Sequence, residues 1–212
     1  MSGQVFRLAR ATSGASSAEF TLVLPLLLIL LFGIIDTGRF MWDMNRAEKA
    51  TQIGVRMAAV TTSVAPGLVA ENYSGKTISG VTLKPGDIIP AAALGKLVCN
   101  SSGCSCTGTC PSDSSTLDST TFNNVLVPRM QQIMPQITPA NVVVTYSGSG
   151  LGTAGSPPIP GVAETMEISP LITVSLRNMQ FRPITTFLFT TINLPSFSST
   201  MTAEDVSGTI SN

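Results

Sequence analysis

The four cysteines are the most reactive side chains of this 212-residue sequence, and they lie within 12 residues: Cys99, Cys104, Cys106 and Cys110. Clustered thiolates either bind zinc or form disulfides. A four-thiolate zinc site uses cysteine pairs with about two to four residues between the two members, separated by a longer loop, and this spacing does not provide such pairs. In an exported domain, an even number of clustered cysteines favours two disulfides. Three pairings are possible, and the bridge from Cys104 to Cys106 is the most strained.

Other candidates for catalytic chemistry fail. The sequence has no histidine, which excludes Ser-His-Asp and Cys-His catalysis and every His-containing zinc site. Residues 150–155 have the GxGxxG spacing of a dinucleotide-binding loop, but prolines follow where a helix is required. Glu164 and Glu167 lack neighbouring metal ligands, so we interpret them as surface charges. We therefore predict a protein that is not an enzyme, with no catalytic residue, metal site or cofactor.

The composition is poor in charge and rich in apolar residues. Twelve basic and 12 acidic residues give a formal net charge of zero, and 11% of residues are charged, against about 25% in typical soluble domains. The mean hydropathy is +0.35. The zero net charge argues against nucleic acid as a partner, because binding it needs a basic surplus. The apolar content excludes a disordered chain.

Much of the hydrophobicity lies in one uncharged run of 16 residues, Phe20–Ile35. Arg7 and Arg10 precede this run, and the first acidic residue is Glu19. A basic start followed by an apolar stretch is typical of a membrane-targeting segment whose N-terminus stays in the cytoplasm while the remainder is exported. Because a membrane-crossing helix needs about 20 residues, we predict a transmembrane segment at about residues 20–42.

The helical pattern continues beyond the apolar run. No proline occurs between Asp36 and Val60, so we predict one helix over residues 15–62, kinked near Pro25 because proline removes a backbone hydrogen bond. Its second half carries a ladder of alternating charges and a face of small residues. The ladder consists of Asp36, Arg39, Asp43 and Arg46, and the small-residue face consists of Ala47, Ala50, Gly54 and Ala58.

The remaining residues, 63–212, are enough for one hydrophobic core. We predict an α+β fold in which the long N-terminal transmembrane helix continues into an exported domain with a mostly antiparallel β-sheet. A Cys-rich loop is expected at residues 99–110, and residues 91–98 are ambiguous. Strands are predicted at 77–83, 142–146, 167–181 with a break at Pro170, 187–194 and 198–202. A helix is predicted at 120–134, capped by Asp118 or Ser119 and interrupted by Pro128.

The junction before the apolar run, GASSAEF at residues 14–20, resembles the processing site of type IV pilin-like proteins, in particular the Flp/Tad branch. In those proteins a membrane-embedded prepilin peptidase cuts after a glycine, and a glutamate five residues into the mature chain is followed by an aromatic residue. Gly14, Glu19 and Phe20 match these positions. Residues 10–60 also resemble the N-terminal signature of the TadE-like family of minor pilins or pseudopilins. The positions that fit it are Asp36, Gly38, Arg39, Asn45 and Ala47.

The resemblance implies cleavage between Gly14 and Ala15. Removal of Arg7 and Arg10 would leave 198 residues with a net charge of 10 − 12 = −2. In an assembled bundle, Glu19 of one subunit would neutralise the new amino group of a neighbour, since two opposite charges buried together cost less than either alone. The alternative is a Glu19 that stays among the lipid headgroups of a chain that is never cut.

The resemblance also implies a function. The chain would be a minor pilin or pseudopilin of a Tad (Flp-type) pilus or a type IV pilus-like secretion system, supporting adhesion or pilus biogenesis. Its partners would be membrane lipids, other pilins of the Tad system and the prepilin peptidase. It would span the bacterial inner membrane once, with the C-terminal domain in the periplasm, or enter an extracellular pilus after processing. The alternative is an uncleaved, membrane-anchored accessory factor of the same machinery.

Overall fold

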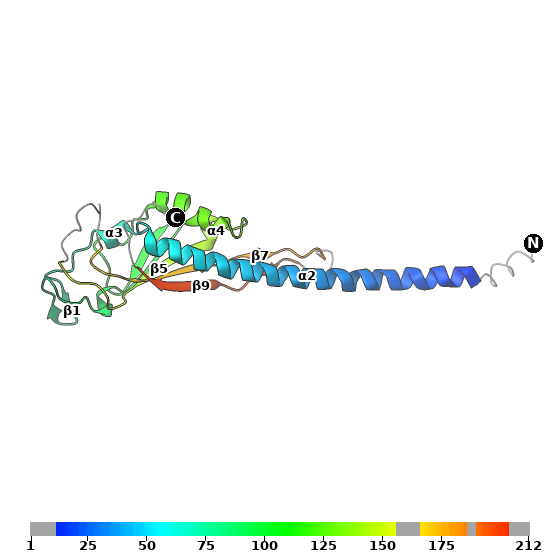
Figure 1. Cartoon of the computed structure of the whole chain (residues 1–212), viewed down its shortest axis with the longest axis horizontal. Coiled ribbons are helices and arrows are strands. Elements are labelled where there is room, and N and C mark those ends of the chain that lie inside the picture. The colour runs from blue at the N-terminus through cyan, green and yellow to red at the C-terminus, as the bar shows by residue number, and fades with distance from the viewer. Residues whose placement is uncertain (1–11, 156–165, 186–189, 204–212) are drawn as a thin grey trace, which may run out of the picture. The chain divides into compact units, whose positions relative to one another are not determined.

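The computed structural model describes residues 12–155, 166–185 and 190–203 (Figure 1). The chain forms two compact units. One is made of the residues up to Trp42 together with Phe181–Ile192, and the other of Asp43–Gln180 together with the residues from Asn193 on.

The first element is the helix α2 (Thr12–Val60), which continues through Pro25 without interruption. The predicted α+β class with a long N-terminal helix is confirmed. The elements after α2 are α3 (Pro66–Val69), β1 (Thr77–Ile78), β2 (Val81–Thr82), η1 (Ala91–Ala93), β3 (Lys96–Asn100), β4 (Gly103–Thr107), η2 (Thr121–Leu126), α4 (Val127–Gln131), η3 (Pro139–Asn141), β5 (Val142–Ser147), β6 (Leu171–Leu176), β7 (Gln180–Phe181), β8 (Ile192–Asn193) and β9 (Phe197–Thr202).

The core of the second unit is built on one five-stranded antiparallel sheet in the order β4-β3-β5-β6-β9. Alternate residues of each strand point to opposite faces, and the register aligns the apolar residues of the three central strands on one face. These residues are Leu97, Cys99, Val142, Val144, Tyr146, Ile172, Val174 and Leu176, all buried. The opposite face carries mainly serine and threonine on β5, β6 and β9, where Thr173 and Thr200 share a hydrogen bond.

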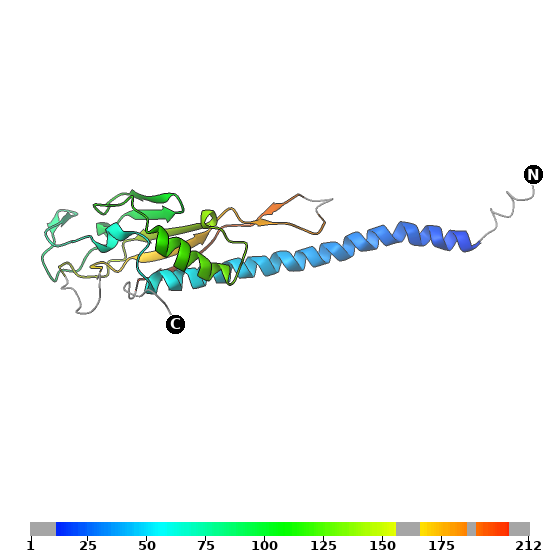
Figure 2. The ribbon, with the colours of Figure 1, turned by 90° about the horizontal axis from the view of Figure 1, so that it is seen from above.

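Helices cover the apolar face of this sheet (Figure 2). The predicted small-residue face of α2 is buried as a whole: Ala47, Ala50, Gly54 and Ala58. Gly54 shows why small residues are needed there, because a Cβ atom at this position would lie 2.8 Å from the sulfur of Met130 on α4 and 3.1 Å from Val174 on β6. The hydroxyls of Thr51 and Ser199 also share a hydrogen bond between α2 and β9.

The predicted helix at 120–134 is present but begins as a π-helical turn, η2, before it becomes α4. Pro128 explains the change, because it has no N–H to donate and the preceding Val127 N–H bonds to the carbonyl of Phe122, five residues back. Asp118 caps the start, as predicted. Its carboxylate accepts hydrogen bonds from the N–H groups of Thr120 and Thr121 and from the Thr121 hydroxyl.

Two strand predictions are wrong in their extent. Residues 77–83 form the short hairpin β1–β2 and not one strand, because Ser79 and Gly80 both have positive φ angles, of 51° and 83°, as the tight turn of a hairpin requires. The long segment predicted at 167–181 is divided into β6 and β7, with Asn178 at a φ of 56° between them. Of the strand predicted at 187–194, the described residues contain β8.

The interpretation of Glu167 as a surface charge is wrong. This side chain is half-buried and accepts a hydrogen bond from the backbone N–H of Tyr73, 2.8 Å away. Burial of Tyr73 and the nearby charge of Glu167 raise the pKa of the tyrosine to about 12. Glu167 therefore holds the segment before β1 in place, whereas Glu164 lies outside the described residues.

We expect Gly54→Leu to destabilise the second unit by about 1–3 kcal/mol, because the added side chain overlaps Met130 and Val174 in a packed core. Urea unfolding in detergent, followed by circular dichroism, measures the change. The matched control is Gly38→Leu in the same helix, where a Cβ atom meets nothing within 4 Å. Equal stability of the two variants would contradict the packing described for Gly54.

Asp118 makes the stability of the domain depend on pH. Burial raises its pKa, but the hydrogen bonds from Thr121 and Thr120 outweigh burial, so the net pKa lies below the ordinary value of 3.8. A lowered folded-state pKa gives stability that is complete above pH 4 and is lost as the pH falls through the folded-state pKa. Asp118→Asn should therefore be less stable than wild type at pH 7, with a difference that shrinks toward pH 3 in urea unfolding. A difference independent of pH would refute this role.

Candidate functional site

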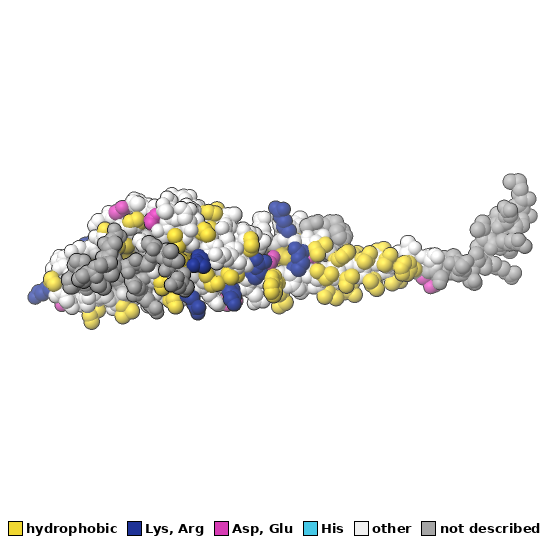
Figure 3. All heavy atoms as spheres, turned by 45° about the horizontal axis from the view of Figure 1, so that its top comes forward, with side chains coloured by type: hydrophobic (Ala, Val, Ile, Leu, Met, Phe, Trp, Pro, Cys, Tyr) yellow, Lys and Arg dark blue, Asp and Glu magenta, His cyan; other side chains and the backbone are white. Residues whose placement is uncertain are grey.

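The N-terminal half of α2 presents an apolar surface that the chain itself leaves largely uncovered. Among the described residues, α2 is the one helix long and apolar enough to cross a membrane, and its apolar window is not buried. Large aliphatic side chains remain exposed from Phe20 to Ile35, and Figure 3 shows them covering this stretch of the helix. An apolar surface of this extent marks a site of contact with lipid or with other proteins.

The residues predicted to take part in processing lie at the start of this surface. Gly14 and Ala15 are within α2, and Glu19 and Phe20 follow in the same helix with exposed side chains. Within the described part of the chain, Glu19 forms no salt bridge. Among those residues, its carboxylate therefore has no cationic partner.

The opposite end of the apolar run is marked by a buried carboxylate. Asp36 is only 7% exposed. One of its oxygens accepts a hydrogen bond from the backbone N–H of Ile184 at 2.7 Å. The other accepts bonds from the backbone N–H and the hydroxyl of Thr185, at 3.0 and 2.8 Å. The guanidinium group of Arg39 completes the arrangement, with its Nη1 atom 3.2 Å from Oδ1 of Asp36. We call this set of four residues the Asp36 junction.

Aromatic packing positions the Asp36 junction. The Phe181 ring of β7 meets Phe40 of α2 edge to face, with ring centroids 5.4 Å apart, and the guanidinium group of Arg39 lies over the same Phe181 ring. Phe40 lies one helical turn beyond Asp36, on the same side of α2. These contacts hold the chain after β7 along the helix, so that Ile184 and Thr185 reach the carboxylate.

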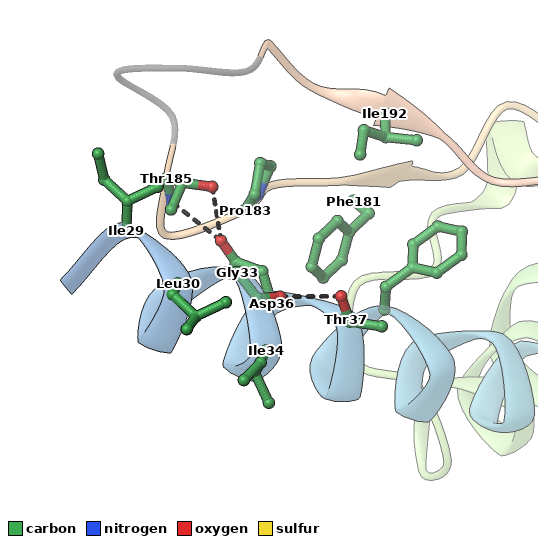
Figure 4. Close-up of a pocket in the computed structure, with 11 residues that line it drawn as sticks. Ile29, Leu30, Gly33, Ile34, Asp36, Thr37, Phe181, Pro183, Thr185 and Ile192 are labelled. Carbon is green, nitrogen blue, oxygen red and sulfur yellow. Dashed lines mark hydrogen bonds between the residues drawn. The ribbon is translucent and has the colours of Figure 1, made fainter. Parts of the chain in front are cut away.

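A cavity of about 640 Å³ lies beside the Asp36 junction, between α2 and the segment made of residues 181–185 and 190–192 (Figure 4). Ile29, Leu30 and Ile34 line it from the helix, and Phe181, Pro183 and Ile192 line it from the other segment. Its polar lining groups, Asp36 and Thr185, are bonded to each other, and the Thr37 hydroxyl is bonded to the carbonyl of Gly33. The cavity is therefore suited to an apolar occupant.

The four cysteines form two local disulfides, Cys99–Cys104 and Cys106–Cys110. The first joins directly opposed residues of β3 and β4. The expected loop is thus partly a hairpin, because β4 occupies Gly103–Thr107. Each bond spans only a few residues, so the pair stiffens this edge of the sheet and does not tie distant parts of the chain together.

The sequence reasoning treated Asp36 as part of a charge ladder and missed its contact with Thr185. The two i, i+3 pairs of that ladder do exist, Asp36 with Arg39 and Asp43 with Arg46. The missed contact joins residues 149 positions apart. Two features pointed toward it: an acidic residue directly after an apolar run, and a second apolar stretch in residues 183–192.

Comparison with protein families gave a match to the N-terminal part of the chain. Residues 14–56 fit the family model described as TadE-like protein, which confirms the resemblance predicted for the N-terminal segment. The family is associated with the Tad pilus, and its members are in general not enzymes. Neither the curated proteins nor the solved structures gave a match.

We expect Asp36→Asn to lower the hydrogen-exchange protection of the Ile184 and Thr185 amides by about 10- to 100-fold. Loss of the charged acceptor weakens two backbone hydrogen bonds, and a bond to a charged group contributes about 1.5–3 kcal/mol. Exchange followed by mass spectrometry in detergent measures the effect. The control is Asp43→Asn, which removes the neighbouring i, i+3 pair. Unchanged protection in Asp36→Asn would show that the carboxylate does not hold this segment.

Proposed function

We propose that the protein is a minor pilin or pseudopilin of a Tad-type pilus, anchored by α2 and assembled through its apolar face. The observation that carries the proposal is that the TadE-like match begins at Gly14 and covers the exposed apolar helix. In this proposal, residues 1–14 are a leader that the prepilin peptidase removes. Residues 15–62 are the assembly helix, and residues 63–212 are the exported domain, in the periplasm or on the pilus.

Glu19 has a defined part in this proposal. Cleavage after Gly14 creates an amino group at Ala15, and Glu19 is an exposed carboxylate at the edge of a surface that other apolar helices would cover. A carboxylate enclosed in such a bundle needs an opposite charge. The amino group of a neighbouring subunit supplies one. Correct pairing of the two charges would then set how far one subunit is shifted along the next.

Within the same machinery, a second candidate is an uncleaved accessory factor that stays in the membrane. The Asp36 junction favours it, because residues 181–185 occupy one side of α2 near the end of the apolar run. A helix that is partly covered by its own chain has less surface for neighbours. The two candidates differ in cleavage and in location, and both differences are measurable.

The N-terminus of protein from native cells distinguishes the candidates. A mature chain that begins at Ala15, found in sheared surface filaments by mass spectrometry, supports the minor pilin. A chain that keeps its first residues in peptidase-containing cells and is found only in membranes supports the accessory factor.

We expect Glu19→Gln to reduce incorporation into filaments by about tenfold or more while the amount of protein in the membrane stays unchanged. The reason is that the neutral amide leaves the buried amino group of the neighbour unpaired, at a cost of a few kcal/mol. Quantitative immunoblots of sheared filaments and membranes provide the measurement. Glu48→Gln is the matched control, since it removes the same charge from an exposed position of the same helix. Equal incorporation of both variants would refute charge pairing at Glu19.

A further inference from the structure

The uncharged part of α2 is short for a membrane span. Phe20–Ile35 has 16 residues, which is about 24 Å of helix, whereas the hydrocarbon core of a bilayer is about 30 Å thick. One end of the run must therefore lie close to a charged residue that approaches the apolar layer. The two candidates are Glu19 at one end and Asp36 at the other.

The structure distinguishes these two ends. Asp36 already has a hydrogen-bond donor for each carboxylate oxygen and an ion pair with Arg39. A carboxylate satisfied in this way loses much less on leaving water than an isolated one. Glu19 is exposed and forms no salt bridge within the described residues. The membrane boundary can therefore extend past Asp36 at lower cost than past Glu19.

Residues beyond Asp36 fit such a boundary. Trp42 and Met41 are exposed on α2, and tryptophan is enriched where membranes meet water. Arg39 is half-exposed, and Arg182 of the neighbouring segment is exposed. These guanidinium groups suit the phosphates of lipid headgroups.

The segment made of residues 181–185 and 190–192 lies alongside this part of α2 and presents apolar side chains to it. Ile184 and Ile192 are 48% and 44% exposed, and the cavity between the segment and the helix has apolar walls. Irregular backbone near a membrane needs partners for its N–H groups. Asp36 supplies them for Ile184 and Thr185, so the junction satisfies the segment and the carboxylate together.

We propose that residues 181–185 and 190–192 form a second membrane-contacting element. It lies in the interfacial layer on the exported side, and the cavity beside Asp36 holds an acyl chain of a bilayer phospholipid. The lipid is the occupant favoured by continuity, because the walls formed by Ile29, Leu30 and Ile34 belong to the apolar surface of the membrane-spanning helix. This inference rests on the membrane anchoring included in the proposed function.

Tryptophan fluorescence in vesicles tests the proposal, since the chain has a single tryptophan. Two variants are made in a Trp42→Phe background, one with Ile192→Trp and one with Ile184→Trp. If one of them fails to fold, the other still tests the proposal. The full-length variants are reconstituted in phosphatidylcholine–phosphatidylglycerol vesicles with bromine near the headgroup end of the acyl chains. Leu30→Trp reports insertion of the helix. Ile88→Trp, at a 71% exposed position of the other unit, reports contact with water.

The expected result is quenching of the Ile192→Trp and Ile184→Trp variants within about twofold of Leu30→Trp, with Ile88→Trp unquenched. If Leu30→Trp is quenched while both segment variants resemble Ile88→Trp, the lipid-contacting role is wrong and the membrane anchor stands. If Leu30→Trp also escapes quenching, the anchor itself is wrong, and the inference that rests on it fails too.

Discussion

The central constraint on this protein is an apolar helix surface with a carboxylate at each end. From Phe20 to Ile35 the helix α2 offers uncharged and almost entirely apolar side chains, and Glu19 and Asp36 bound this run. The hydroxyl of Thr21 is the exception, and it is bonded to the carbonyl of Ser17. Apolar side chains need lipid or protein around them, while carboxylates need water, a cation or N–H groups. Whatever surrounds the helix has to satisfy both demands within about 25 Å of helix axis. Residues 181–185 and 190–192 do so at one end.

The second half of α2 meets a different demand with different residues. Beyond Trp42 the buried residues of α2 are mainly small ones, although Val55 and Met57 are buried too, and Gly54 is close to both Met130 and Val174. Large side chains suit a surface that lipids or other helices cover, because they maximise apolar contact. Small ones suit contact with a sheet, because they allow a close approach of the backbone. The change in residue size along the helix thus corresponds to a change in what the helix contacts.

Features that depend on local pattern were predictable from the sequence, and features that depend on distant partners were not. Helical spacing and the absence of proline after Asp36 predicted α2 to its end, and alternation predicted β5 and β9 closely. Alternation over residues 77–83 predicts one strand, but Ser79 and Gly80 are turn-forming residues and their positive φ angles divide it into the β1–β2 hairpin. The bonds between Asp36 and Thr185 were missed because no local rule brings together residues 149 positions apart. The processing residues rest on a sequence motif. The structure adds that Gly14 and Ala15 lie in α2 and that the side chains of Glu19 and Phe20 are exposed.

The two carboxylates that bound the apolar run are not equivalent, and their difference separates anchoring from assembly. Asp36 finds its donors in its own chain, so a single molecule can place that end of the run near lipid without help. Glu19 is exposed and forms no salt bridge in the part of the chain that the structure describes. If the surroundings of α2 change from lipid to other helices, the environment of Asp36 can stay as it is, whereas Glu19 loses water and gains a need for a cation. The need for a second molecule is therefore concentrated at the end of the helix where the proposed cleavage creates a new amino group.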